Sequence, residues 1–187
     1  MRVLAWIAAA LLAGAAQAAP KGACTVTSPQ HTVALVELFT SEGCPYCPAA
    51  DRWMRELPAA GLGRERVVPL ALHVDYWNDK GWTDRFAQAR FTDRQREYKA
   101  LHGARALYTP QVMLAGEDTR RWREPEQFAA DVQAINARPS RAAITLAIEP
   151  AEAGALRVRA QARTSSPETR PVPCCKLRPT RTAFRAP

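Results

Sequence analysis

Cysteine is scarce in this sequence: 187 residues hold five, at positions 24, 44, 47, 174 and 175. Five cysteines are too few for a disulfide scaffold, and the odd count leaves at least one thiol unpaired or paired with another chain. Structural zinc would require a second Cys/His pair at ligand spacing, and none stands within the domain predicted below. No metal site is therefore expected, and the cysteines are not what holds the fold together.

Hydrophobic runs long enough to span a membrane are also missing. A good membrane span needs about 20 apolar residues. The run Val3–Ala16 is shorter, follows Arg2 and leads into Ala16-Gln17-Ala18, which places small residues where a signal peptidase reads them. We therefore predict a signal peptide over residues 1–18, cleaved near Ala18, and a periplasmic or secreted protein. Such a chain would meet a membrane only if that peptide stayed uncleaved.

A basic stripe on an ordered face is absent too, although the formal net charge is +8. Arg2 belongs to the signal peptide, and five Lys and Arg residues lie beyond residue 164. Between residues 19 and 163, 20 basic residues stand against 17 acidic ones. Nucleic-acid-binding domains carry clustered basic residues. Nucleic acid is therefore not expected as a partner.

What the sequence does contain is a Cys-x-x-Cys pair, Cys44-Pro45-Tyr46-Cys47, between a strand-like and a helix-like segment. A thiol on the first turn of a helix lies at the positive end of the helix dipole, which favours the thiolate. This predicts Cys44 as nucleophile and Cys47 as resolving thiol, and Pro45 suits a first helical turn. An oxidising compartment would allow the pair to persist as a disulfide.

Hydrophobic patterns predict an α/β domain over residues 31–138. Residues 32–39 read as a strand buried on both faces, the segment after Cys44 as a helix ending near Pro58, and residues 66–74 as a central strand, which together form a parallel βαβ unit. A helical insert is predicted at about 83–103, with Thr92 and Gln95 as a capping box and Gly103 as its stop. Residues 108–114 predict a strand, 115–119 a turn, 120–122 a returning strand and 124–136 a helix.

The C-terminal part shows a different pattern. Residues 141–163 alternate apolar with small or polar side chains around Pro150 to Gly154, which predicts a β-hairpin appendage. A lone hairpin is marginal in water and needs more strands or a partner. Residues 164–187 are rich in proline and arginine without a period, so we expect a disordered tail, in which Cys174 and Cys175 are free or intermolecular.

Three motifs in order carry a resemblance: residues 36–51 around the cysteines, His73-Val74-Asp75-Tyr76-Trp77 with Gly81-Trp82, and Tyr108-Thr109-Pro110-Gln111-Val112. Together they resemble an exported bacterial thioredoxin-like family known mainly as a domain of unknown function. The Pro-Tyr pair between the cysteines is similar to that of glutaredoxins. The resemblance implies a thioredoxin-like fold with a helical insertion, here followed by the hairpin appendage and the tail.

The resemblance also implies roles at the site. Cys44 would attack a substrate disulfide, Cys47 would resolve the mixed disulfide, and Pro110, expected cis, would leave the Thr109 backbone free to pair with a bound peptide. Pro45 and Tyr46 would also face the substrate. Protein or peptide thiols and disulfides are the implied substrates, with a separate redox partner protein possible and no cofactor beyond the Cys44–Cys47 disulfide. Glutathione use is not implied, because residues 116–119 read Gly-Glu-Asp-Thr and lack the glutaredoxin glycine pair.

Three further residues allow two interpretations each. Glu37 is either a buried proton relay for Cys47 or a partly exposed carboxylate paired with an arginine. His73 and Asp75, at the carboxyl end of the second strand, either line the site together with Trp77 and Trp82 or fasten the insert to the sheet.

Two alternatives to an oxidoreductase also stay open. The first is a non-catalytic binding module on the same fold, because a fold alone does not decide function. The second is a Cu(I)-handling protein in which Met113 or His73 supplies a third soft ligand to the Cys-x-x-Cys pair.

Overall fold

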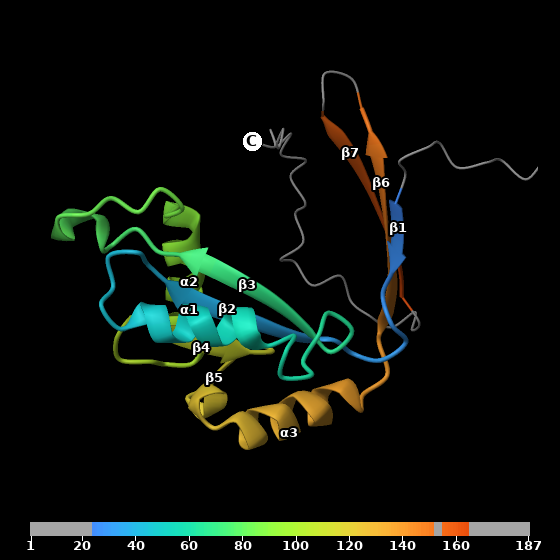
Figure 1. The fold of residues 1–187 in the computed structure, drawn as a ribbon, viewed down its shortest axis with the longest axis horizontal. Coiled ribbons are helices and arrows are strands. Elements are labelled where there is room, and N and C mark those ends of the chain that lie inside the picture. The colour runs from blue at the N-terminus through green and yellow to red at the C-terminus, as the bar shows by residue number, and fades with distance from the viewer. Residues whose placement is uncertain (1–23, 152–154, 165–187) are drawn as a thin grey trace, which may run out of the picture. The chain divides into compact units, whose positions relative to one another are not determined.

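The computed structural model describes residues 24–151 and 155–164 (Figure 1). Within these ranges the chain divides into two compact units, one over Ser28–Ala143 and another that combines residues 24–27 with Ile144–Ala162. The predicted signal peptide and residues 165–187 of the predicted tail, with Cys174 and Cys175, lie outside the described residues, whereas Thr164, the first residue of that tail, ends a strand.

The larger unit is a mixed α/β structure built on a four-stranded sheet. The strand order is β3-β2-β4-β5, in which β2 runs parallel to β3 and antiparallel to β4. A parallel pair requires a crossover, and the first helix provides it. In chain order the elements are β2 (Ala34–Thr40), α1 (Cys47–Glu56), β3 (Val67–His73), the 3-10 turn η1 (Asn78–Lys80), α2 (Ala89–Leu101), β4 (Gln111–Leu114), β5 (Glu117–Asp118), the 3-10 turn η2 (Arg121–Arg123) and α3 (Pro125–Asn136).

Strand β2 is buried on both faces of this sheet, as its apolar run predicted. Val36 and Leu38 pack into one cluster with residues of α1 and α3, including Met54 and Phe128. Phe39 points the other way, into a smaller cluster that Tyr98 of α2 helps to cover. Successive side chains of a strand alternate between faces, so neighbouring residues of β2 reach different helices.

The prediction of a central strand at residues 66–74 was wrong in its position, because β3 lies at the edge of the sheet. Its middle is exposed, with Val68 and Leu70 at 44% and 42%. Pro69 within it lacks a backbone N–H, and a proline inside a sheet is tolerated at an edge strand. The apolar composition suggested burial on both faces, whereas the proline was the more informative signal.

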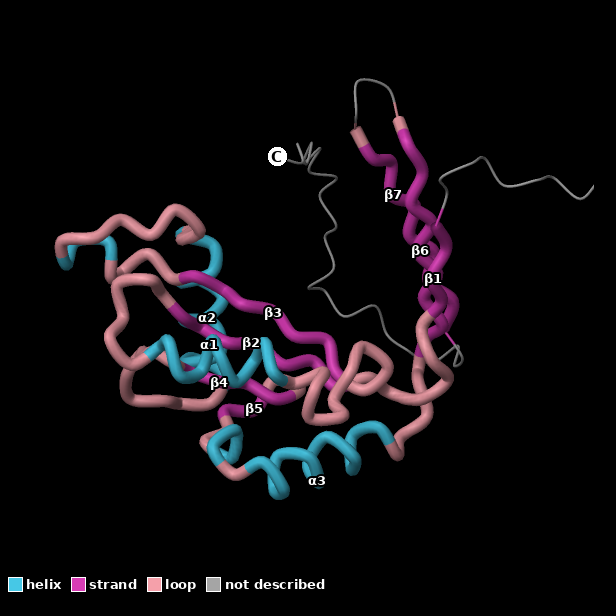
Figure 2. The backbone as a smooth tube through the Cα atoms, viewed as in Figure 1, coloured by secondary structure: helices cyan, strands magenta, loops and turns pink. Residues whose placement is uncertain are grey.

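The insert between β3 and α2 is helical over a shorter range than expected. After η1 the chain continues mostly as loop, and α2 begins at Ala89 (Figure 2). The predicted capping box was wrong: Thr92 and Gln95 lie inside α2, and both side chains are buried. Their side chains form hydrogen bonds with residues distant in the sequence and do not cap the helix. Gly103, with φ +60°, directly follows the C-cap of α2, in agreement with its predicted role as a stop.

The hairpin after β4 is tighter than expected. Ala115 and Gly116 both have positive φ, 51° and 92°, as a two-residue hairpin turn requires. The return strand β5 therefore already begins at Glu117, where a turn was predicted. The return strand expected at residues 120–122 is absent, because residues 121–123 form η2, which carries the buried Trp122. Helix α3 follows, in the segment where a helix was predicted, and buries Phe128, Val132 and Ile135 on one stripe.

The smaller unit is a three-stranded sheet with the order β1-β6-β7. Strands β6 (Ala142–Pro150) and β7 (Leu156–Thr164) are neighbours in the segment where a hairpin was expected. Strand β1 (Cys24–Thr27) was not predicted and pairs antiparallel with β6, Val26 opposite Leu146. A third strand satisfies one edge of a hairpin that would be marginal alone.

Candidate functional site

Cys44 and Cys47 form a disulfide with their Cα atoms 5.4 Å apart. Both are buried, at 2% and 0% exposure. Helix α1 begins at Cys47, so Cys44 lies in the turn before the helix rather than on its first turn as predicted. A hydrogen bond from Cys47 N to Cys44 O, at 3.3 Å, closes that turn. The first-turn proline is Pro48, whereas Pro45 lies before the helix.

The loop that leads into the disulfide is held by side chains on both sides. Gly43 N donates to Ser41 Oγ at 3.1 Å, and Glu42 N donates to Asp84 Oδ2 at 2.8 Å. A Cβ at Gly43 would come within 3.4 Å of the Trp77 Cβ, so this loop packs closely on Trp77. The disulfide therefore stands on a fixed segment.

Trp77 connects this loop to the loop before β4. The peptide bond from Thr109 to Pro110 is cis, as the resemblance implied. Trp77 Nε1 donates a hydrogen bond to Thr109 Oγ1 at 2.8 Å, while the Cβ of Trp77 lies against Gly43. The fold thus brings together the two loops that the sequence separates by more than sixty residues.

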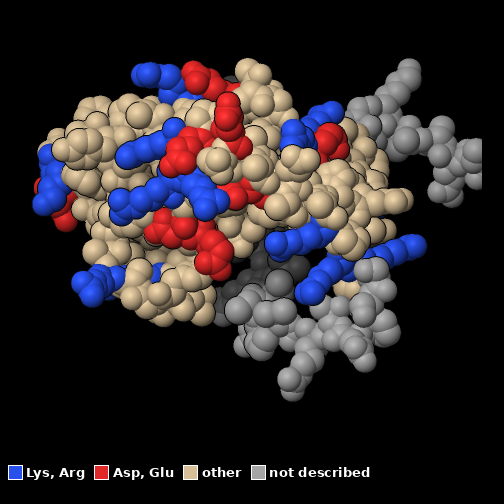
Figure 3. Space-filling model, turned by 90° about the horizontal axis from the view of Figure 1, so that it is seen from below, with Lys and Arg blue, Asp and Glu red and all other residues tan. Residues whose placement is uncertain are grey.

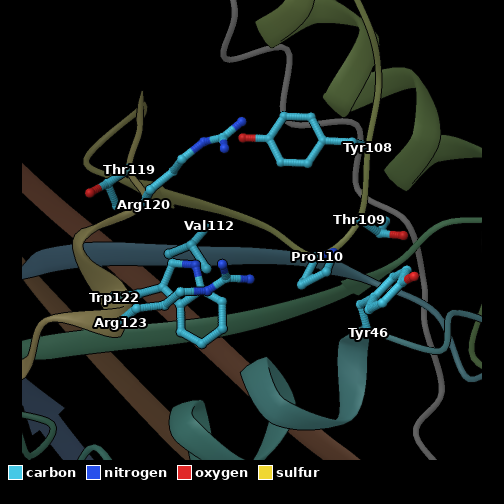
Figure 4. A pocket seen from close by; sticks show the side chains of 9 residues that line it. All are labelled: Tyr46, Tyr108, Thr109, Pro110, Val112, Thr119, Arg120, Trp122 and Arg123. Carbon is cyan, nitrogen blue, oxygen red and sulfur yellow. The ribbon is translucent and has the colours of Figure 1, made fainter.

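A cavity of about 220 Å³ opens beside these loops (Figure 4). Its walls come from the turn before α1, from the segment around the cis-proline and from η2. Figure 4 shows Tyr46 and Pro110 together on one side of it, with η2 on the other. The lining residues are Tyr46, Tyr108, Thr109, Pro110, Val112, Thr119, Arg120, Trp122 and Arg123.

His73, at the end of β3, contacts the buried carboxylate of Asp84. Its Nδ1 lies 2.6 Å from Asp84 Oδ2, and Asp84 also accepts hydrogen bonds from the backbone N–H groups of Glu42 and Phe86. Burial raises the pKa of Asp84, but the three hydrogen bonds outweigh it, and the net effect lowers that pKa below its ordinary value. Asp84 therefore joins the sheet, the insert and the loop before Cys44.

Asp75 and its neighbours hold α2 against the same end of the sheet. Thr92 Oγ1 donates to Asp75 Oδ1 at 2.5 Å, and Asp75 N donates to Thr92 Oγ1 at 3.1 Å. Gln95 bonds the Tyr108 carbonyl and Gln111 Oε1 at 2.8 and 2.7 Å. The second interpretation of His73 and Asp75, fastening of the insert, agrees with these contacts. Trp77 contacts both loops beside the disulfide, at Gly43 and at Thr109.

Glu37 is fully buried and is bound by α2. Arg94 Nε donates to Glu37 Oε1 at 2.5 Å, and the Tyr98 hydroxyl donates to Oε2 at 2.6 Å. Burial and the carboxylate raise the pKa of Tyr98 to about 12. Glu37 neighbours Val36 and Leu38, which face α1, so its side chain points to the opposite face of the sheet. The arginine pairing expected of Glu37 is present, but the residue is buried, and this orientation does not favour a relay to Cys47.

Asp51 is a residue that the sequence reasoning did not single out. It lies four residues after Cys47 on α1, and residues at this spacing are neighbours on a helix surface. Thr40 Oγ1 donates to Asp51 Oδ1 at 2.9 Å. Burial raises the pKa of Asp51, and this outweighs the opposing effects of the Thr40 hydrogen bond and of His73. The i to i+4 spacing from Cys47 was the available signal.

Met113 and His73, the two residues considered as a third metal ligand, both lie in other contacts. Met113 is buried in the cluster beside α2, and His73 is engaged by Asp84. Among residues 24–151 and 155–164, no three His, Cys, Asp or Glu side chains gather as metal ligands would. In the same ranges no helix combines the length and apolarity needed to cross a bilayer. On the face drawn in Figure 3, basic and acidic side chains lie interspersed.

Comparison with known proteins gives a family without an assigned function. Residues 35–182 match the family described as protein of unknown function DUF1223. A protein of Agrobacterium tumefaciens, solved by X-ray crystallography, is 28% identical, with a TM-score of 0.45; the match covers 73% of this chain and 75% of that one. No curated protein matches at a significant level.

Proposed function

We propose that this chain, which belongs to the DUF1223 family of proteins of unknown function, is an exported thiol–disulfide oxidoreductase with a thioredoxin-like fold. Its substrates are protein or peptide disulfides, and it works without a bound cofactor. The observation that carries the proposal is the Cys44–Cys47 disulfide before α1, linked through Trp77 to the loop of the cis-proline Pro110. The strand order of the larger unit agrees with a thioredoxin-like arrangement, and the predicted signal peptide supports export.

The reaction follows from thiolate chemistry. In the reduced protein the Cys44 thiolate attacks one sulfur of a substrate disulfide; a mixed disulfide forms, and the other substrate sulfur leaves as a thiolate that takes up a proton. The Cys47 thiolate then attacks the Cys44 sulfur, which releases the second substrate thiol and restores the Cys44–Cys47 disulfide. Two electrons have passed to the substrate. The reverse sequence oxidises a substrate dithiol, and a redox partner protein returns the pair to its starting state.

The loops around the disulfide support substrate positioning. Thr109 and Pro110 precede β4 and line the cavity together with Tyr46. A backbone held in this way can pair with an extended peptide, the mode in which main-chain hydrogen bonds supply affinity and pockets supply specificity. Tyr46 is 74% exposed and stands between the two cysteines in the sequence. It is the side chain of the motif best placed to touch a substrate.

The reduction potential of the Cys44–Cys47 pair tests the proposal. Mature protein is equilibrated against glutathione buffers, its thiols are counted, and bound copper is assayed on the same sample. We expect a reversible two-electron couple between about −270 and −120 mV, the range of working exchange proteins. Cys47→Ser should accumulate a mixed disulfide with a peptide substrate, whereas Cys44→Ser should form none.

One observation favours a second candidate, a non-catalytic binding module with a structural disulfide. Both sulfur-bearing residues are almost fully buried in the oxidised structure, at 2% and 0% exposure. Structural disulfides resist the glutathione pool and have potentials below about −300 mV. A pair that cannot be reduced in glutathione buffers would overturn the oxidoreductase proposal in favour of this module. Protein that is purified with copper on these cysteines would favour a Cu(I) carrier.

A further inference from the structure

We infer that the cavity beside the disulfide binds a carboxylate of the substrate, so that the protein prefers peptide disulfides flanked by acidic residues, with Arg120 and Arg123 as the recognising groups. This inference rests on the proposed function. The cavity is lined by Tyr46 of the Cys-x-x-Cys motif and by Pro110. A peptide joined to Cys44 therefore has this cavity within the reach of its neighbouring side chains.

The charge of the cavity is one-sided. Two of its nine lining residues are arginines and none is acidic. The arginine between them, Arg121, is paired with Asp131 at 2.9 Å and does not line the cavity. Among the residues that the structure describes, no ion pair within 4.0 Å involves Arg120 or Arg123. Neither guanidinium is therefore paired with a carboxylate of the described residues, and Arg120 also hydrogen-bonds the Tyr108 side chain.

Aromatic rings hold these two guanidinium groups in place. The Arg120 guanidinium carbon lies 5.7 Å from the centre of the Tyr108 ring, and that of Arg123 lies 4.7 Å from the centre of a Trp122 ring. Trp122 is itself buried and belongs to the main apolar cluster. A guanidinium near a ring face gains cation–π attraction and keeps N–H groups for a ligand. Figure 4 shows both arginines at the side of the cavity away from Tyr46.

The Tyr108 hydroxyl does not compete for a substrate carboxylate, because it is already hydrogen-bonded to the carboxylate of Asp118. It donates to both oxygens of Asp118, at 2.8 and 2.6 Å. Burial and Asp118 raise the pKa of Tyr108 to about 12, so this side chain stays protonated at neutral pH. Asp118 does not line the cavity.

The size of the cavity indicates what it takes. About 220 Å³ is below the roughly 300 to 1,000 Å³ of sites that enclose a drug-sized ligand. It suits one or two side chains of an extended peptide. The planar fork of arginine matches a carboxylate through two parallel hydrogen bonds. The occupant is therefore an Asp or Glu side chain close to the substrate cysteine.

The test uses peptides that differ only in the residues flanking a disulfide, which are Glu, Gln or Lys. We expect reduced wild-type protein to react at least about tenfold faster with the Glu peptide than with the Lys peptide in 20 mM NaCl, and less selectively in 500 mM NaCl, because salt screens exposed charges. The double variant Arg120→Gln/Arg123→Gln should lose this preference and react with the Glu and Lys peptides at rates within about twofold of each other. Arg121→Gln is the matched control and should retain the preference.

Binding is measured separately, so that the inference survives or fails independently of catalysis. Peptides with serine in place of cysteine are titrated by calorimetry, and the wild type should bind the Glu peptide at least about tenfold more tightly than the Lys peptide. Equal affinities would overturn the inference even if exchange occurs. Selective binding without any exchange would uphold the inference and refute the proposed function.

The same exchange experiment is repeated with glutathione disulfide as the substrate, since this small molecule also carries carboxylates. If the double variant slows only its reaction with glutathione disulfide, and wild type does not distinguish the Glu from the Lys peptide, the cavity takes a small anionic thiol and the peptide inference is wrong.

Discussion

Asp51 is the carboxylic acid that follows Cys47 by one turn of α1, and in the proposed oxidoreductase its environment would suit proton transfer. Burial raises the pKa of Asp51 above its ordinary value, which brings a carboxylic acid closer to the neutral range where proton transfer is efficient. Thr40 fixes the carboxyl group through its hydroxyl. Asp51 lies on the same helix as Cys47, whereas Glu37, which the sequence had suggested, points to the opposite face of the sheet.

We predict that Asp51→Asn slows disulfide exchange at least about tenfold, since general acid–base catalysis contributes roughly 100- to 10,000-fold, without weakening the fold. A carboxyl whose pKa is raised by folding stabilises the native state below its unfolded pKa, and that contribution is lost as pH rises through the folded pKa. At pH 7 the neutral Asn, which can still accept from Thr40, should be at least as stable. Stopped-flow rates and urea unfolding check both points.

The control for Asp51→Asn is Asp93→Asn, on the exposed side of α2. It removes one carboxylate of the same kind and should change neither the exchange rate nor its pH profile. An Asp51→Asn protein that exchanges at the wild-type rate between pH 6 and 8 would rule out a proton-transfer role for Asp51.

We predict that Arg94→Met lowers the free energy of unfolding by roughly 2 kcal/mol, since it removes a hydrogen bond to a charged group and leaves Glu37 buried beside Tyr98 alone. Arg94 is 43% exposed, so water screens part of the interaction. Arg96→Met, which loses an exposed pair with Asp93 on the same helix, should cost less than about 0.5 kcal/mol. Urea unfolding at pH 7 gives both values, and equal losses would contradict the buried-pair explanation.

The cysteine spacing and the resemblance predicted which residues gather around Cys44 and Cys47, whereas the directions of side chains could not be predicted. Cys44, Cys47 and Pro110 were found by spacing and by resemblance, and the structure joins the first two in a disulfide. The two faces of β2 hold different helices, and only the order of the whole sheet decides which helix meets Glu37. Asp51 was overlooked because an acid inside a helix is usually a solvent-facing residue.

At the scale of elements, Asp84 is the point at which the insert is attached to the sheet. It accepts from two backbone N–H groups and contacts His73, so three segments meet at one carboxylate. In Asp84→Asn the side-chain NH₂ group, a hydrogen-bond donor, would face one of the N–H donors that the carboxylate now accepts from. We expect a loss of about 2 kcal/mol at pH 7, the scale of hydrogen bonds to a charged group.

The pH dependence of Asp84→Asn follows from the lowered pKa of Asp84. A carboxyl with a folded pKa below its unfolded value stabilises the fold above about pH 3.9, and the contribution is lost as pH falls through the folded pKa. The difference between wild type and variant should therefore shrink steadily below pH 4 in urea titrations. Asp79→Asn, an exposed change in the same insert, should show no such trend. A difference that is constant from pH 7 to pH 2 would contradict the assignment.

Elements with one dominant local signal were predicted, and those decided by distant partners were not. Strand β2 and helix α3 follow from burial on both faces and from a helical stripe. Thr92 and Gln95 have the residue types and spacing of a cap, but Asp75 and Tyr108 bind them from elsewhere in the chain. The tight turn at Ala115-Gly116 lacks the Asn-Gly or Asp-Gly pair by which such turns are usually recognised.

At the scale of the molecule, the larger unit is closed by its own ends. Thr32 N donates to Arg138 O at 2.8 Å, and Ser140 N donates to Gln30 O at 2.7 Å. We predict that residues 28–143 fold without the remainder, with a cooperative thermal transition within about 5 °C of the full chain, a shift that corresponds to about 1 kcal/mol. Calorimetry and circular dichroism test this. A fragment that shows no cooperative transition would mean that the smaller unit is required.

The edges of the larger sheet bear on how this protein behaves at high concentration. An open edge offers unpaired N–H and C=O groups to a strand of another molecule and so invites polymerisation. Here one edge is β5, only two residues long, and the other, β3, has Pro69 in its middle. A strand added beside β3 would find one donor missing, and one added beside β5 would find almost nothing to pair with. This sheet therefore resists growth into fibrils through either edge.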